Sequence, residues 1–486
     1  MRKLIVYLPL LLTLIVSNLP VAGQGNLPYR YNELSGSYYA EQQSALKKAK
    51  PDAAAFTDKK AQKKYIELSE EVRKSIISGF VDNNFVYQKD IVDYLGQIAL
   101  TLKKHNPTLF KETPLVLLDR SDVVNAYALG NNIVVINLGL FLFVQSREEL
   151  ALIIAHELAH NILRHSENSL KETAARLSSD EYQESLNAVL DSKYERLSRL
   201  KKIFIGYSVN RSRHSRYKET SADSLAIALL KNSKIGFDAR FFLRLDSVKG
   251  VSQQPLLQPV KYFFEQYKLG FDDSWLKQSK GLSSRNYQFK DTSLAEEDSL
   301  KTHPDCVLRY EKTKTQSDAN LSLTEIPGNL KEFGRKITLW NKIATLELTP
   351  ALYSIFQEKE KGNTDPWYDL MAGAVFSSLN YADKDLRRFN VAGSRQKEYV
   401  ATTYYELQTL LTKMNRASLE KNCITFQQHN FSRSLQQYEK ELYLALQLLD
   451  RETMPNKKRI EQISKQAFGS SADNPYQELF NTLSKN

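Results

Sequence analysis

The residues of this chain best suited to chemistry are His156, Glu157 and His160, which form the pattern His-Glu-X-X-His within a helical stretch. Residues four apart lie on one face of a helix, so the two histidines can bind a single metal ion. Neutral imidazoles suit zinc, and a catalytic zinc takes three protein ligands and leaves one position for water. Glu157 lies about 100° further around the helix, where a base could take a proton from that water.

The third ligand must come from elsewhere in the chain, and Glu219 is the best candidate. Asp223 follows four residues later and shares its helical face, so one carboxylate could bind zinc while the other orients a ligating imidazole. A solvated, charged helix face is the plainer interpretation of this pair. With the His-Glu-X-X-His pattern present, we favour the ligand. The sequence therefore predicts one Zn²⁺ per chain, held by His156, His160 and Glu219.

The helix that carries the histidines is expected to begin at Ser146. Ser146 and Glu149 form a capping box, and apolar residues then follow at helical spacing, with no Gly or Pro before His165. On an unbroken helix His165 is turned nearly to the side opposite His156. We therefore interpret His165 as a structural or surface histidine and not as a ligand.

Several separated motifs resemble those of one known family. They are Asn125–Ala128 with Ile133–Leu140, His156–His160, Ser215–Asp223, and Thr302–Pro304 with Arg309. In this order they resemble the gluzincin zinc metallopeptidases related to the CAAX prenyl proteases, a family that includes HtpX, the mitochondrial Oma-type proteases and periplasmic BepA. The chain departs from the family pattern at Gly130–Asn132, usually a Pro-Gly-Gly-like turn, and at Ala159, usually glycine.

The resemblance implies an α+β fold: a gluzincin-type core with the active-site helix under a small mixed sheet, followed by a mainly α-helical C-terminal region. It also implies a substrate-binding edge strand, because an exposed strand edge binds extended peptide through main-chain hydrogen bonds. An ordinary short strand is the plainer alternative, and the two are compatible. The strand residues are Asn125, Ala126, Tyr127 and Ala128.

His303 is given a role only by the resemblance. It could support the cleft, stabilise the oxyanion as a catalytic residue, or occupy the open position of zinc in a resting state. An His303→Ala protein that cleaved substrate at the parent rate would rule out the last two roles. Arg309, six residues later, is expected to be structural.

The N-terminus has the plan of a secretory signal peptide. Two basic residues precede an apolar run from Leu4 to Val16, and small residues near Gly23 offer a cleavage site. An exported and most simply periplasmic protein is expected, with a secreted or membrane-anchored form as the alternative. The expected divisions are a signal peptide over 1–23, a polar leader over 24–65, a zinc metallopeptidase domain over 66–325 and a helical C-terminal domain over 326–486.

Charge and cysteine content leave two questions open. The net charge is +11, and basic residues gather over 196–202 and 211–218. This surface could make peripheral membrane contact or attract acidic substrates, although a solvated face is the plainer interpretation, and no nucleic-acid reader motif is present. Cys306 and Cys423 could form one disulfide in an oxidising compartment.

Three functions follow from these observations. The leading one is a zinc-dependent endopeptidase that hydrolyses peptide bonds of exported or envelope proteins, with protein quality control added by analogy alone. The alternative is a chaperone-like or latent protein that binds substrates and cleaves them weakly or under regulation. A chance motif in a helical scaffold would predict no stoichiometric zinc. The C-terminal helical region could recruit partners, but its sequence contains no convincing tetratricopeptide repeat that would identify a partner.

Overall fold

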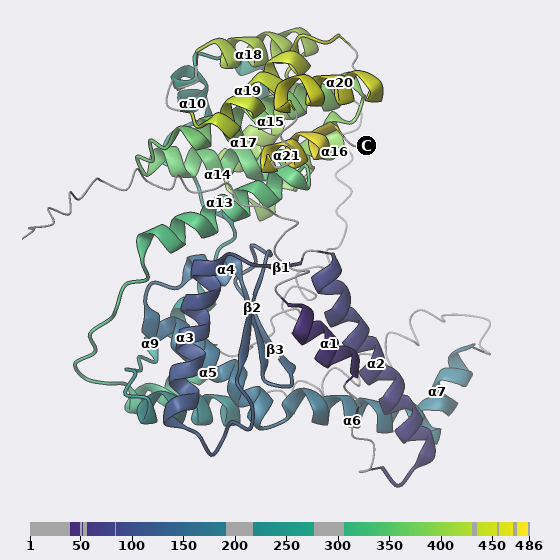
Figure 1. The fold of residues 1–486 in the computed structure, drawn as a ribbon. Coiled ribbons are helices and arrows are strands. Elements are labelled where there is room, and N and C mark those ends of the chain that lie inside the picture. The colour runs from purple at the N-terminus through teal and green to yellow at the C-terminus, as the bar shows by residue number, and fades with distance from the viewer. Residues whose placement is uncertain are drawn as a thin grey trace, which may run out of the picture.

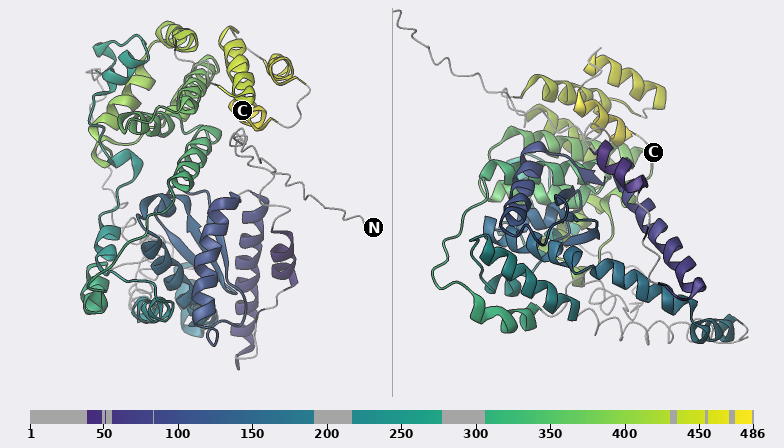
Figure 2. Two further views of the ribbon diagram at one scale, coloured as in Figure 1. Left: turned by 60° about the vertical axis from the view of Figure 1, so that its left-hand side comes forward. Right: turned by 60° about the horizontal axis from the view of Figure 1, so that its bottom comes forward.

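Two lobes make up the molecule in the computed structural model (Figure 1). The sheet lobe carries a small β-sheet with helices on both faces, and the helical lobe is built from helices (Figures 1 and 2). The predicted class, α+β with a mainly helical C-terminal region, is confirmed. The structure describes residues 39–48, 51, 56–82, 84–190, 217–276, 306–429, 435–453, 456–469 and 474–484.

One mixed sheet of four strands lies at the centre of the sheet lobe, in the order β1-β2-β4-β3. β2 and β4 are parallel, whereas β1 and β3 run antiparallel to their neighbours. Within the described part of the chain, β3 is thus an edge strand. The strands are β1 Phe85–Val86, β2 Leu115–Asp119, β3 Ala126–Gly130 and β4 Ile133–Asn137.

Strand β4 is buried on both faces, which explains its unbroken apolar sequence. Because successive side chains point to opposite faces, Val134 and Ile136 join a core with α3 and α5. Ile133 and Val135 face the other way and pack with residues of α2. The helices of this lobe are α1 Ala40–Lys48, α2 Lys59–Val81, α3 Lys89–His105, α4 Leu138–Phe143, α5 Arg147–Ile162, α6 His165–Ser178, α7 Asp180–Leu190, a helical segment over 217–232, α9 Arg240–Asp246, α12 Cys306–Thr313 and η3 Lys314–Gln316.

The β3–β4 hairpin turns through residues that tolerate left-handed backbone. The φ angles of Gly130, Asn131 and Asn132 are +83°, +48° and +57°. Glycine and asparagine adopt this region most readily, and a two-residue turn with positive φ at both positions matches the twist of the flanking strands. The departure from the family's turn sequence therefore preserves a tight hairpin.

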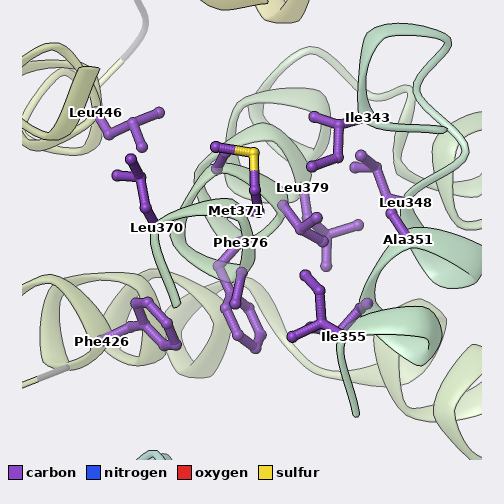
Figure 3. Close-up of a cluster of buried hydrophobic side chains, with 14 of the residues drawn as sticks. Ile343, Leu348, Ala351, Ile355, Leu370, Met371, Phe376, Leu379, Phe426 and Leu446 are labelled. Atoms are coloured by element: carbon purple, nitrogen blue, oxygen red, sulfur yellow. The ribbon is translucent and has the colours of Figure 1, made fainter. Parts of the chain in front are cut away.

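The helical lobe packs around α15, most of which is buried. Met371, Phe376 and Leu379 of α15 meet side chains from several surrounding helices (Figure 3). The helices of this lobe are η1 Val251–Gln253, α10 Val260–Gln266, η2 Asp273–Leu276, α14 Leu348–Glu360, α15 Pro366–Lys384, α16 Arg388–Ala392, η4 Lys397–Tyr399, α17 Thr402–Lys413, α18 Arg416–His429, α19 Gln437–Asp450, α20 Lys457–Phe468 and α21 Pro475–Ser484.

Helix α13, Gly328–Ala344, connects the lobes. Its Leu330 and Ile337 belong to the sheet-lobe core, whereas Trp340 and Ile343 belong to the helical-lobe core. The ammonium group of Lys331 donates to main-chain carbonyls at the end of α4, which fixes α13 against the sheet lobe. One helix thus has a buried face in each core.

The two cysteines are both buried and free. Cys306 packs in the sheet-lobe core and Cys423 in the helical-lobe core, so the disulfide considered from the sequence does not form. Among the described helices, none combines the length and apolar character needed to cross a bilayer. The expected signal peptide and the basic residues 196–202 and 211–216 lie outside the described residues, and the four domain divisions remain predictions.

Candidate metal centre

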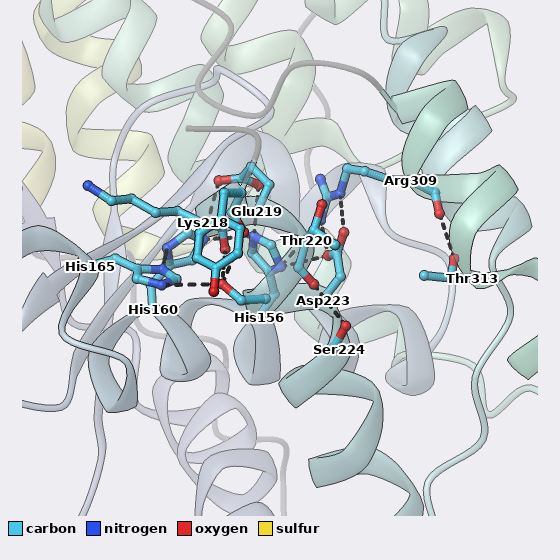
Figure 4. A network of polar contacts seen from close by, with 12 residues as sticks. His156, His160, His165, Lys218, Glu219, Thr220, Asp223, Ser224, Arg309 and Thr313 are labelled. Atoms are coloured by element: carbon cyan, nitrogen blue, oxygen red, sulfur yellow. Dashed lines mark hydrogen bonds and ion pairs between the residues drawn. The ribbon is translucent and has the colours of Figure 1, made fainter. Parts of the chain in front are cut away.

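Two histidines of α5 direct ring nitrogens at one another. The Nε2 atoms of His156 and His160 lie 3.1 Å apart (Figure 4). The rings meet edge to face, with their centroids separated by 4.7 Å. Two nitrogen lone pairs at this distance repel one another unless a proton or a cation lies between them. The two nitrogens are therefore placed to share one proton or to bind one cation.

Glu219 brings a carboxylate to the same point from the helical segment 217–232. Its Oε2 lies 3.3 Å from His156 Nε2, and its Oε1 lies 3.4 Å from His160 Nε2. One ligand atom from each of the three residues falls within 4.8 Å of the others. Donors around a tetrahedral zinc lie about 3.3–3.4 Å apart when the bonds are about 2.0–2.1 Å long. The donor types and their spacing therefore fit zinc.

Glu157 follows His156 on α5 and is also buried, with 3% of its surface exposed. Its position in the helix turns the carboxylate about 100° away from the first histidine, to the flank of the ligand pair. A buried carboxylate on the residue that follows a candidate metal ligand is suited to accept a proton from a reacting group.

Behind His156, Asp223 and Arg309 form a buried ion pair (Figure 4). Asp223 Oδ1 lies 2.9 Å from His156 Nδ1 and 2.6 Å from Arg309 Nη2. The guanidinium group also stacks 4.3 Å from the centre of the Phe242 ring. This geometry fixes the His156 ring with Nε2 towards Glu219.

The electrostatics follow from these contacts. Burial and the Arg309 charge oppose a proton on His156, but the hydrogen bonds to Asp223 and Glu219 outweigh them and raise the pKa of His156 to about 9 in the metal-free protein. Burial alone would raise the pKa of Asp223, yet His156 and Arg309 together lower it to about 2. Asp223 is thus an anion across the whole neutral range.

His165 is placed differently from the expectation. The helix does not continue to it: α5 ends at Ile162, Arg164 takes a left-handed conformation with φ +56°, and α6 begins at His165. The break turns the ring back, so His165 Nδ1 lies 2.9 Å from His160 Nδ1. The expectation that His165 faces away from the site is therefore wrong. The three residues whose ligand atoms converge are His156, His160 and Glu219. That His165 is not a ligand remains a prediction.

Asn161 attaches the edge strand β3 to helix α5. Its Oδ1 accepts the N–H of Gly130 at 2.9 Å, and its Nδ2 donates to the carbonyl of Ile133 at 3.0 Å. The side chain thus bonds both ends of the β3–β4 turn. Sequence reasoning missed this residue, because partners about thirty positions away leave no local pattern (a hydrogen-bond spacing of 28 and 31 residues).

The expected substrate strand lies along α5. Strand β3 begins at Ala126 and packs against α5. Among the described strands it pairs only with β4, so its other side is an edge of the sheet, with Tyr127 and Ala128 half-buried there and Ser166 Oγ 3.5 Å from the Ala128 carbonyl. Asn125 precedes the strand, and its carbonyl accepts the N–H of Asn137 at 3.1 Å. His303 lies outside the described residues.

Comparison with known proteins agrees with this geometry. Residues 97–317 match Peptidase family M48, and this range includes all the residues that meet at the candidate metal centre. A relative from Vibrio cholerae serotype O1, named as a candidate beta-barrel assembly-enhancing protease, is 31% identical over 173 residues. That match covers 34% of this chain and 34% of the relative, so the chain spans about a third of the relative's length.

Proposed function

Because residues 97–317 belong to Peptidase family M48, a family of zinc metallopeptidases, we propose that this protein is a zinc-dependent endopeptidase that hydrolyses exported or envelope proteins. The observation that carries the proposal is the convergence of His156, His160 and Glu219 from two helices. A chance motif in a scaffold would not bring a distant carboxylate to both imidazoles.

The chain's own residues divide the work of hydrolysis. When bound at such a site, zinc supplies Lewis acidity, which makes water a nucleophile near neutral pH and polarises a carbonyl. Glu157 takes the proton from the attacking water and returns it to the leaving amine. Asp223 holds His156 in place from behind, with its charge balanced by Arg309.

The edge strand supplies the substrate site. Residues Asn125, Ala126, Tyr127 and Ala128 lie at or next to β3, which is an edge strand among the described residues and can pair with an extended peptide through main-chain hydrogen bonds. His303 is assigned to stabilise the oxyanion or to close the site at rest. The N-terminal signal-like sequence and the relative's name, a beta-barrel assembly-enhancing protease, support an exported, periplasmic location and a part in protein quality control.

The test compares the full-length protein with its Glu157→Gln and Glu219→Ala variants. Elemental analysis should find one zinc per chain in the parent and in Glu157→Gln, and much less in Glu219→Ala. Cleavage of a labelled unfolded protein should be chelator-sensitive in the parent and about 10²–10⁴-fold slower in Glu157→Gln.

Two outcomes would contradict the proposal. Full cleavage by Glu157→Gln would remove the base assignment, and full zinc content in Glu219→Ala would remove the ligand assignment. If the parent bound zinc and unfolded protein without cutting it, the chaperone-like or latent alternative would be favoured.

A further inference from the structure

We infer that His165 is a positioning residue for the metal centre: its Nδ1 accepts a hydrogen bond from His160 Nδ1–H and so keeps the Nε2 lone pair of His160 directed at the metal. This inference rests on the zinc site of the proposed function. It gives a role to a histidine that carries no ligand atom of the three-residue group.

The contact between the two rings is close and built by the backbone. The Nδ1 atoms of His160 and His165 lie 2.9 Å apart, and the ring planes cross at 74°. At this distance the two nitrogens must share one hydrogen, because two lone pairs would repel and two N–H groups would clash. The left-handed Arg164 between α5 and α6 brings His165 to this position.

The far side of the His165 ring decides which nitrogen carries the hydrogen. The single hydroxyl hydrogen of Ser221 is directed at the carbonyls of Lys218 and Tyr217, 3.0 and 3.1 Å from Oγ, and a carbonyl can only accept. The hydroxyl hydrogen is thus used, and Ser221 Oγ, 3.4 Å from His165 Nε2, accepts from that ring. With its hydrogen on Nε2, His165 has a lone pair on Nδ1.

The tautomer of His160 then follows. His165 Nδ1 can only accept, so His160 donates from Nδ1 and its Nε2 atom keeps the lone pair that a metal requires. The two ligand histidines are therefore held by different groups. A carboxylate, Asp223, orients His156, whereas a neutral ring anchored on Ser221 orients His160. Ser221 is two residues from Glu219, so one helix positions the third ligand and supports the second.

Three substitutions at one position test the inference in the full-length protein. The amide of Asn reaches the place of a histidine Nδ1 and keeps an acceptor there, whereas the amide of Gln reaches the place of Nε2. Phe keeps the ring shape and removes both nitrogens. Zinc affinity is measured by competition with a chromophoric chelator, without substrate.

We expect His165→Asn to bind zinc within about threefold of the parent and His165→Gln and His165→Phe to bind about 10–100-fold more weakly. A packing role predicts the reverse order, with Phe best tolerated. Circular dichroism of the zinc-free proteins checks folding. If the Phe variant does not fold, the comparison of zinc affinity between the Asn and Gln variants still tests the inference.

The inference is overturned if the Gln variant binds zinc as tightly as the parent, or if the Asn variant loses as much affinity as the Gln variant. If the protein proves to have no endopeptidase activity, the measurement of zinc affinity still tests the inference, because it uses no substrate. Failure of the zinc site itself would be seen separately, as a parent protein that binds no zinc.

Discussion

Asp223 Oδ1 lies 2.9 Å from His156 Nδ1, with both residues buried. The same carboxylate is the partner of Arg309, whose guanidinium group is enclosed by the sheet-lobe core. Asp223 therefore makes two separate contacts: it holds the ring of His156, a candidate ligand, and it neutralises a buried cation. A substitution should affect zinc binding and stability together.

Asp223→Asn should weaken zinc binding about 10–100-fold, because a neutral amide orients His156 less firmly. It should also destabilise the metal-free protein by about 3–5 kcal/mol, since removing one partner leaves the Arg309 charge buried without compensation. Chelator competition and chemical denaturation measure the two effects. Asp180→Asn is the control, because the Asp180 side chain is 84% exposed and should change neither quantity. Unchanged zinc affinity in Asp223→Asn would contradict the orienting role.

Zinc affinity should rise with pH across the neutral range. In the metal-free fold the pKa of His156 is raised from 6.5 to about 9, so its proton stabilises that fold fully below pH 6.5 and this stabilisation is lost as the pH rises to about 9. Zinc must displace the same proton, so apparent affinity should increase about tenfold per pH unit over this window.

Titration of the purified protein with zinc between pH 6.5 and 9 checks this dependence. In Asp223→Asn, the carboxylate that raises the pKa of His156 is missing, and the increase should level off at a lower pH. A parent affinity that stays flat over the whole window would show that no proton is released on binding.

Asn161 should influence substrate and not metal. Its replacement by Ala removes the partners of Gly130 N–H and the Ile133 carbonyl. The free energy of unfolding should fall by about 1–3 kcal/mol. The loosened β3–β4 hairpin should lower kcat/KM while zinc affinity stays the same. Asn161→Asp is the matched variant: it keeps the acceptor for Gly130 and should lose less activity. Equal zinc loss and activity loss in Asn161→Ala would place its role at the metal instead.

Local spacing was enough to predict that His156 and His160 meet on one face of a helix. The separation of His156 and His160 depends only on helical geometry, and the cap was also correct in part: Ser146 Oγ accepts the N–H of Glu149. The Glu149 carboxylate, however, accepts from Gln145, one residue before the expected partner. The apolar run of β4 likewise followed from burial on both faces.

What the sequence could not show are features decided by tertiary contacts. The stretch Leu163–Arg164 contains no glycine or proline, so the helix break that turns His165 towards His160 has no local signal. The separation of Cys306 and Cys423 has the same cause. Each cysteine is buried in a different hydrophobic core, and residue types alone do not show which core a segment joins.

The two cores should respond independently to substitution. Phe376 is fully buried in the helical-lobe core, so Phe376→Ala should destabilise that lobe by about 3–5 kcal/mol. Zinc affinity should not change, because the candidate ligands belong to elements of the sheet lobe and, among the described elements, only α13 has residues in both cores. Thermal unfolding with and without zinc separates the effects, since zinc should raise the transition temperature of the sheet lobe only.

The control for this prediction is Phe389→Ala, a substitution in the helical lobe at a side chain that is 68% exposed. It should leave both transition temperatures unchanged. A drop in zinc affinity in Phe376→Ala alone would show that α13 transmits packing changes to the metal centre.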